Sequence, residues 1–246
     1  MNPLPLALQM YTLRDAMHED FAGTAQRIAD IGYTAVELAG YGNLTATEAA
    51  AALKNAGLKA AGMHVGIERL RTEPEAVLAE AELFDSPFIT CPAYPRDHLK
   101  TAAQCEAAGE ELNRIGAQVR RGGRRFAFHN HGVEFEEVDD RLRIDWMLRA
   151  AEPRNLEMEL DVYWSDFSGA DTVRWLRENG ARVTQIHLKD TKELGASGKI
   201  DFPALLAVLE EIGAVELYIY EQEEYSSTPW DGIRRALDTL RGWGKI

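Results

Sequence analysis

Cysteine is scarce in this sequence, with only Cys91 and Cys105 among 246 residues. Two thiols in a chain of this length do not make the disulfide framework of small secreted proteins. No run approaches the roughly 20 apolar residues that a membrane span needs. The first residues, Met1–Pro5, also lack the positive charge of a secretory signal peptide. These absences favour a cytoplasmic protein with no membrane partner.

Basic residues are also few, since 27 Lys and Arg face 40 Asp and Glu and the formal net charge is −13. Binding to nucleic acid without sequence preference requires a basic surface, so we expect no nucleic-acid partner. A glycine-rich phosphate-binding turn is missing after the first apolar run, where the sequence reads Tyr11–Asp15. That absence argues against an open, doubly wound nucleotide-binding sheet. It also favours an unphosphorylated small-molecule substrate.

What the sequence does contain is an alternation of eight short apolar runs with longer helical patterns. Several runs are almost continuously apolar, which is typical of strands buried on both faces. The predicted strands are Leu6–Thr12, Thr34–Gly40, Lys59–Val65, Phe88–Ala93, Arg125–His131, Leu156–Trp164, Val183–Asp190 and Val215–Gln222. The predicted helices include Phe21–Ile31, Thr47–Asn55, Pro74–Phe84, Ala102–Arg120 and Phe202–Ile212.

Parallel strands require crossover connections, and these are usually helices. Dividing 246 residues by eight gives about 31 residues per unit, which is enough for a (β/α)₈ TIM barrel. No linker or change in composition divides the chain, so we expect a single α/β domain over residues 1–246. The segments Asp190–Ile200 and Glu134–Ile144 are predicted to be long loops or a small hairpin, where binding residues often lie.

Polar residues recur at or near the carboxyl ends of the predicted strands, the end that carries the active site in barrel enzymes. They include four of the six histidines: Glu37, His64, His129, His131, Asp161, His187, Lys189 and Glu221. One such residue alone would be read as a hydrogen-bonded structural group. Several together would each lose several kcal/mol of solvation on burial. A divalent metal ion offsets that loss, so the pattern predicts a metal site.

Two further features are open to a functional or a structural reading. Lys189 could contact substrate or form an ordinary ion pair with Asp190. Tyr11 and Trp164 could pack against a small-molecule ligand, or fill the core as other aromatic residues do.

With these residues in view, the chain resembles the xylose isomerase-like barrel superfamily, the sugar phosphate isomerase/epimerase group. The resemblance spans nearly the whole chain in the same order. It rests on Gln9–Asp15, Ala35–Leu38, Gly62–Gly66, Phe128–His131 with Glu134 and Phe135, Glu159–Trp164, Ile186–Asp190 and Tyr220–Gln222.

The resemblance implies a divalent ion held by one residue from each of the last four barrel strands. By position these are Asp161, His187 and Glu221, with His129 where the family usually has Glu. His131 is an alternative fourth ligand, and Glu134 could reach the site instead. Two histidines and two carboxylates suit Mn²⁺, Zn²⁺, Co²⁺ or Fe²⁺ better than Mg²⁺.

The implied activity is a metal-dependent isomerase or epimerase that acts on a sugar or keto-sugar through an enediolate. Glu221 is the expected base, with Glu37, His131 and Lys189 as further catalytic candidates. His64, Tyr11 and Trp164 are expected to bind the carbohydrate, and the assembly to be a homodimer or homotetramer.

Three other activities compete with this interpretation. A dehydratase or lyase acting on a keto-sugar or an inosose-like cyclic polyol would use the same residues. A sugar-binding barrel without catalysis is disfavoured, because binding alone does not require a base beside a metal ion. A related DNA-repair endonuclease is disfavoured by the net charge of −13.

Overall fold

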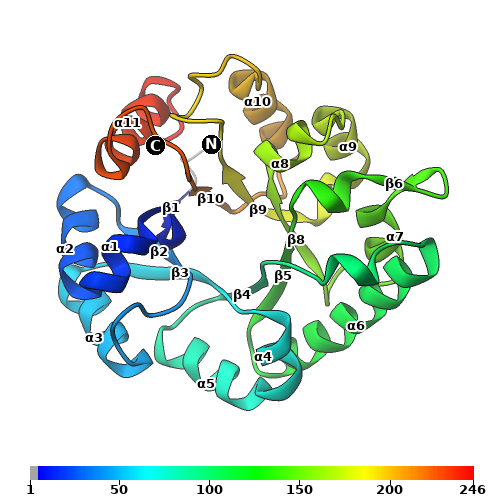
Figure 1. Ribbon diagram of the computed structural model, residues 1–246, viewed down its shortest axis with the longest axis horizontal. Helices are drawn as coiled ribbons and strands as arrows, with labels where there is room; N and C mark the ends of the chain where they lie inside the picture. Colours follow the sequence, from blue (N-terminus) through cyan, green and yellow to red (C-terminus); the bar gives the residue numbers. More distant parts are fainter. Residues whose placement is uncertain (1–4) are drawn as a thin grey trace.

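The eight apolar runs form the strands of a closed parallel barrel in the computed structural model, which describes residues 5–246 (Figure 1). The barrel strands are β1 Leu6–Gln9, β2 Ala35–Leu38, β3 Lys59–His64, β4 Phe88–Cys91, β5 Arg125–His129, β8 Glu157–Asp161, β9 Val183–Leu188 and β10 Leu217–Tyr220. They follow one another around the barrel in chain order, and β10 closes it against β1. The predicted TIM barrel is confirmed.

Helices surround the barrel on its outer side (Figure 1). They are α1 Arg14–Glu19, α2 Phe21–Ile31, α3 Ala46–Ala56, α4 Ile67–Thr72, α5 Pro74–Leu83, α6 Ala102–Arg121, α7 Arg143–Arg149, α8 Val162–Phe167, α9 Thr172–Asn179, α10 Phe202–Ile212 and α11 Pro229–Gly242. Within the described chain, none of them combines the length and the apolar character needed to cross a membrane.

Local chemistry sets the ends of these helices. The Thr45 hydroxyl accepts the Glu48 backbone N–H, and the Glu48 carboxylate accepts the Thr45 N–H, so α3 begins with a capping box. Gly57 then ends α3 at φ +73°, a backbone conformation that favours glycine.

All eight barrel strands end earlier than the apolar runs predict, and β1 and β8 show the physical reason. The Gln9 side chain accepts the Tyr11 N–H and starts a 3₁₀ turn, Met10–Leu13, where the predicted strand continued to Thr12. Asp161 accepts the Trp164 N–H and caps α8, where the predicted strand continued to Trp164. In both places a polar side chain at the strand end bonds to the backbone just after it, and this ends the extended conformation.

The two predicted loop regions differ from each other. Part of Glu134–Ile144 forms a small antiparallel hairpin of β6, Glu137–Val138, and β7, Arg141–Leu142. Residues 190–200 form an irregular loop after β9.

The main hydrophobic core lies between the outer face of the sheet and the helices, and includes Leu8, Val36 and Ile186. The interior of the barrel has its own small apolar cluster of Ala7, Ala35, Leu217 and Ile219. Farther along the same strands the inward positions are polar, as at Gln9 and Glu37. The apolar cluster therefore fills the end of the barrel opposite the polar residues.

Candidate metal centre

Register between neighbouring strands brings the predicted site residues together. His129 of β5 lies beside Glu159 of β8, and Asp161 of β8 lies beside His187 of β9. Side chains two apart in a strand share a face, so Glu159 and Asp161 both point into the barrel. Asn130 joins β5 to β8, since its Nδ2 donates to the Asp161 carbonyl oxygen and its Oδ1 accepts the Asp161 N–H.

Four side chains form the first candidate metal centre, here called the His129 group: His129, Asp161, His187 and Glu221. Each offers one ligand atom, and these atoms lie within 4.8 Å of one another. His129 Nε2 is 3.6 Å from Asp161 Oδ2, and His187 Nδ1 is 2.7 Å from Glu221 Oε2. These are the four residues that the family resemblance implies as ligands.

The donor atoms of this group suit a cation. Both ring nitrogens of His129 and the Oδ2 atom of Asp161 have no hydrogen-bond partner within residues 5–246. His129 is 3% exposed and Asp161 is fully buried. A buried polar atom without a partner costs about 1–3 kcal/mol, and more when it is charged. A divalent ion between these atoms would remove that cost, so the residues fit the implied metal.

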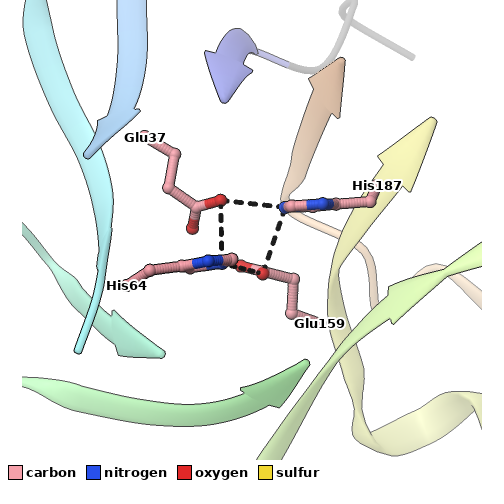
Figure 2. Close-up of side chains that lie close together, drawn as sticks. All are labelled: Glu37, His64, Glu159 and His187. Carbon is pink, nitrogen blue, oxygen red and sulfur yellow. Dashed lines mark hydrogen bonds and ion pairs between the residues drawn. The ribbon is translucent and has the colours of Figure 1, made fainter. Parts of the chain in front are cut away.

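A second set, here called the Glu159 group, consists of Glu37, His64, Glu159 and His187. Figure 2 shows its four side chains joined by a closed circuit of contacts. His64 Nε2 lies 2.7 Å from Glu159 Oε1 and 3.2 Å from Glu37 Oε2. His187 Nε2 lies 2.8 Å from Glu37 Oε2 and 3.1 Å from Glu159 Oε1. His187 therefore belongs to both groups, through different nitrogens.

The two carboxylates make the histidines of the Glu159 group more basic. Burial by itself lowers the pKa of His64, but Glu37 and Glu159 raise it to about 10. Burial likewise opposes the charged form of His187, yet Glu159, Glu221 and Glu37 hold its pKa well above the usual value. Burial raises the pKa of Glu159, but His187 and His64 hold it well below its ordinary range.

Lys189 contributes a buried positive charge beside the His129 group. Its Nζ donates to Glu221 Oε1 at 3.2 Å and to Glu223 Oε1 at 2.5 Å, and lies 5.0 Å from the centre of the Trp164 ring. Burial lowers the pKa of Lys189, but the charges of Asp161 and Glu221 raise it above the ordinary value.

The alternative ion pair between Lys189 and Asp190 is wrong. Asp190 instead accepts the backbone N–H groups of Thr191 and Ser197, because the chain turns into the irregular loop at this point.

His131 and Glu134, the two alternative ligands, lie outside both groups. The Glu134 carboxylate accepts the His131 backbone N–H at 2.8 Å and so bonds within its own turn. Burial is the largest cause that raises the pKa of Glu134 to about 7. Burial, with His129 nearby, lowers the pKa of His131 to about 4, so its ring is neutral at neutral pH.

A cavity of about 400 Å³ opens beside these residues. It is lined by Gln9, Tyr11, Ala39, His64, Pro92, His129, His131, Trp164, Glu221 and Glu223. Tyr11 is 43% exposed, while Glu37 is fully buried and does not line the cavity. Glu37 therefore contacts His187 and Gln9, and the catalytic role suggested for it by the sequence stays a prediction.

A larger cavity of about 910 Å³ is lined by other residues, among them Pro5, Ala60 and Phe88. Its lining includes none of the residues of either group. The cavity of about 400 Å³ is therefore the one that adjoins the candidate metal ligands.

Sequence reasoning gave no role to three residues that shape this region: Glu159, Asn130 and Glu223. Glu159 stands inside an apolar run, and the one signal for it is its place two residues before Asp161. Asn130 holds β5 against β8, and Glu223 accepts a hydrogen bond from Lys189. Neither contact follows from local sequence.

Comparison with known proteins gives a consistent family and fold. The family described as xylose isomerase-like TIM barrel matches residues 25–243. No curated protein matches the sequence significantly.

Solved structures resemble the chain over nearly its whole length. A sugar phosphate isomerase/epimerase from Parabacteroides distasonis has a TM-score of 0.85 at 22% identity, covering 98% of this chain and 97% of its own. A 3-keto-D-glucoside 4-epimerase from E. coli has a TM-score of 0.75 at 17% identity, covering 97% and 99%. A probable 3-DHS dehydratase from Bacillus anthracis has a TM-score of 0.68 at 15% identity, with the same coverage. At these identities the likeness establishes the fold.

Proposed function

Because this chain belongs to the xylose isomerase-like TIM barrel family, we propose that it is a divalent-metal-dependent isomerase or epimerase of a sugar or keto-sugar. The observation that carries the proposal is the set of unpartnered, buried donor atoms on His129 and Asp161. They face His187 and Glu221 beside a cavity of about 400 Å³. The isomerase/epimerase names of two similar structures agree with this activity.

The metal is proposed to be held by His129, Asp161, His187 and Glu221. Two imidazoles and two carboxylates favour Mn²⁺, Zn²⁺, Co²⁺ or Fe²⁺ over Mg²⁺. A bound divalent ion would supply positive charge that polarises a sugar carbonyl and stabilises an enediolate.

Glu221 is the proposed base. Burial raises its pKa, but the hydrogen bond with His187 and the charge of Lys189 hold the pKa well below the ordinary value, so the group is ionised. Its carboxylate can accept the proton when the C–H bond next to the carbonyl breaks. The electron pair then forms the carbon–carbon double bond of the enediolate, and the carbonyl oxygen takes the negative charge.

Return of the proton decides the product. Delivery to the neighbouring carbon gives an isomer, and delivery to the opposite face of the same carbon gives an epimer. The neutral ring of His131 reaches the cavity from the end of β5, whereas Glu221 follows β10, with β8 and β9 between these strands. The neutral His131 ring can return a proton to the opposite face only as a relay, giving the proton of one nitrogen while its other nitrogen takes one from water, and the protonated Glu221 then restores that water.

Three further residues are proposed to bind the sugar. Tyr11 and Trp164 line the cavity and offer ring surfaces to sugar C–H groups. His64, which also lines the cavity, is proposed to hydrogen-bond a hydroxyl through its Nδ1 atom.

A dehydratase or lyase is the second candidate, and the position of Lys189 is the observation that favours it. Its ammonium group lies 3.2 Å from Glu221 Oε1, so a base and a charged acid stand side by side. After Glu221 removes a proton, Lys189 can protonate a departing hydroxyl as its C–O bond breaks. The dehydratase name of a similar structure agrees with this second reaction.

Proton NMR in D₂O distinguishes these activities. Metal-loaded protein is incubated with ketoses, keto-sugars and inosose-like polyols, and the exchanging hydrogen is identified. We expect exchange next to a carbonyl, with an isomer or epimer as product; an elimination product would assign the lyase. Asp161→Ala should abolish exchange, whereas His98→Gln, at an exposed histidine, should preserve it. A tightly held metal without exchange on any of these sugars would contradict an enzymatic role and favour a binding protein.

Assembly and location follow from the same proposal. We propose a homodimer or homotetramer in the cytoplasm. Light scattering after size-exclusion chromatography tests the assembly, and cell fractionation tests the location.

A further inference from the structure

The Glu159 group could serve as a second metal site or as a support for the first, and its hydrogen bonds within the group and to its surroundings favour the second. Around the circuit in Figure 2, neighbouring donor atoms are 2.7, 2.8, 3.1 and 3.2 Å apart. Ligands about 2.0 Å from a tetrahedral zinc ion are about 3.3 Å apart. All four contacts are shorter than that and have hydrogen-bond length, and two of them, His64 with Glu159 and His187 with Glu37, also have hydrogen-bond geometry. The Glu159 group is therefore hydrogen-bonded to itself.

Its two carboxylates are also held in place from outside the circuit. Gln9 Nε2 donates to Glu37 Oε2 at 2.7 Å, and Thr90 Oγ1 donates to Glu159 Oε2 at 3.2 Å. Gly62 leaves room for Glu37, because a Cβ atom at this glycine would lie 2.8 Å from Glu37 Oε1. Both carboxylates thus have fixed positions deep in the barrel.

His187 connects the two groups through its two ring nitrogens. Nδ1 faces Glu221 at 2.7 Å, on the side of the His129 group. Nε2 faces Glu37 at 2.8 Å and Glu159 at 3.1 Å. A metal-bound histidine keeps one N–H, and a carboxylate at the other nitrogen fixes which one it is. Two carboxylates at Nε2 hold the proton there and leave the Nδ1 lone pair for a cation.

We propose that Glu37 and Glu159 are positioning residues that fix the Nε2–H form of His187 and so determine how tightly the metal is held. This inference rests on the metal site of the proposed function. Neither carboxylate touches the substrate, since neither lines the cavity. Their effect passes through the imidazole ring, whose orientation and basicity they set. Without them, His187 would lose its orientation while all four proposed ligands remained.

The test uses the zinc-loaded full chain with ¹⁵N-labelled histidine. Long-range ¹H–¹⁵N NMR, assigned with His187→Gln, shows which nitrogen carries the proton. We expect the Nε2 proton to give a strongly deshielded signal and Nδ1 to carry none. Chelator competition then measures zinc affinity. Outer carboxylates of this kind alter metal affinity about 10–100-fold, so Glu159→Gln and Glu37→Gln should each weaken zinc binding by about that factor.

Glu157→Gln is the matched control, because Glu157 lies on the same strand but pairs with Arg125 and Thr184. It should leave zinc affinity and the Nε2 proton signal unchanged. Glu159→Asp keeps the charge and should recover part of the affinity that Glu159→Gln loses.

Several results would overturn the inference. Zinc bound to His187 through Nε2 in the wild type would overturn the inference. This result needs no variant, so it can be obtained even if the Gln variants do not fold. Zinc affinity within twofold of wild type in both Gln variants, with the Nε2 proton signal unmoved, would overturn the positioning role and leave the proposed function intact. A wild-type protein that binds no divalent ion would overturn both.

Discussion

The His129 group and the Glu159 group share His187 and the same barrel interior, yet they differ in how their polar atoms are satisfied. In the Glu159 group the four contacting atoms each lie within 3.2 Å of another member, and one buried atom of the described residues, Glu37 Oε1, has no hydrogen-bond partner. In the His129 group three buried atoms on His129 and Asp161 have no hydrogen-bond partner within the described residues. The number of histidines and carboxylates is the same in both.

The difference teaches that composition alone does not identify a metal site. In the Glu159 group the Nε2 atoms of both histidines lie at hydrogen-bond distance from carboxylates, so these contacts need no ion. Atoms that remain unpaired at full burial lack that compensation. This contrast is the reason why we propose the His129 group as the metal site and the Glu159 group as the support of His187.

The largest effect is expected from His187→Ala, which removes the member common to both groups. Metal affinity should fall more than about 100-fold, beyond the range expected for an outer carboxylate. The free energy of unfolding should fall by about 3–5 kcal/mol, because two buried carboxylates lose a partner. Chelator competition and urea unfolding measure the two quantities. Retained metal with unchanged stability would contradict the shared role of this residue.

Glu221→Gln tests the proposed base without removing Glu37 or Glu159, the carboxylates that contact His187 Nε2. Loss of a general base should slow proton exchange by about 10²–10⁴-fold. The Nε2 contacts of His187 with Glu37 and Glu159 remain in this variant. Exchange measured by NMR in D₂O at the wild-type rate would show that Glu221 is not the base.

A pair of leucine substitutions compares the groups directly in metal-free protein. His129→Leu removes nitrogens that have no partner, so the free energy of unfolding should stay the same or rise. His64→Leu removes the partner of Glu159 and should lower the free energy of unfolding by about 1–3 kcal/mol. Urea unfolding measures both, and equal losses in the two variants would remove the distinction between the groups.

The smallest expected effect is the pH dependence that His64 of the Glu159 group contributes to stability. Burial lowers the pKa of His64, but Glu37 and Glu159 raise it from 6.5 to about 10. Protonated His64 therefore stabilises the fold fully below about pH 6.5, and this contribution is lost as the pH rises toward 10.

One pKa unit corresponds to about 1.4 kcal/mol, so metal-free wild type should lose more than about 1 kcal/mol of stability between pH 6.5 and 10, relative to His64→Gln. Urea unfolding across this range measures the difference. Parallel pH profiles for the two proteins would contradict the charged state of His64.

Much of the fold could be predicted from sequence because its signals are local. Apolar runs mark strands, and a glycine such as Gly57 marks the end of a helix. The ends of β1 and β8 were predicted too late, because the apolar pattern continues through Met10 and Val162 while Gln9 and Asp161 bond to the backbone after them. That capping depends on side-chain geometry that periodicity does not contain.

The site was predicted less completely than the fold. Its residues could be located at strand ends, but their partners depend on barrel register. Glu37 lies within reach of His187, 150 positions later in the chain, and no sequence spacing indicates this contact. Glu159 was overlooked because an apolar run conceals a single inward carboxylate.

Anomalous X-ray scattering at the zinc edge, from crystals of the zinc-loaded protein, tests the central claim most directly. We predict one peak per chain, bounded by His129, Asp161, His187 and Glu221, with the Glu159 group free of zinc. A peak bounded by Glu37, His64 and Glu159, or no peak in either group, would contradict the account.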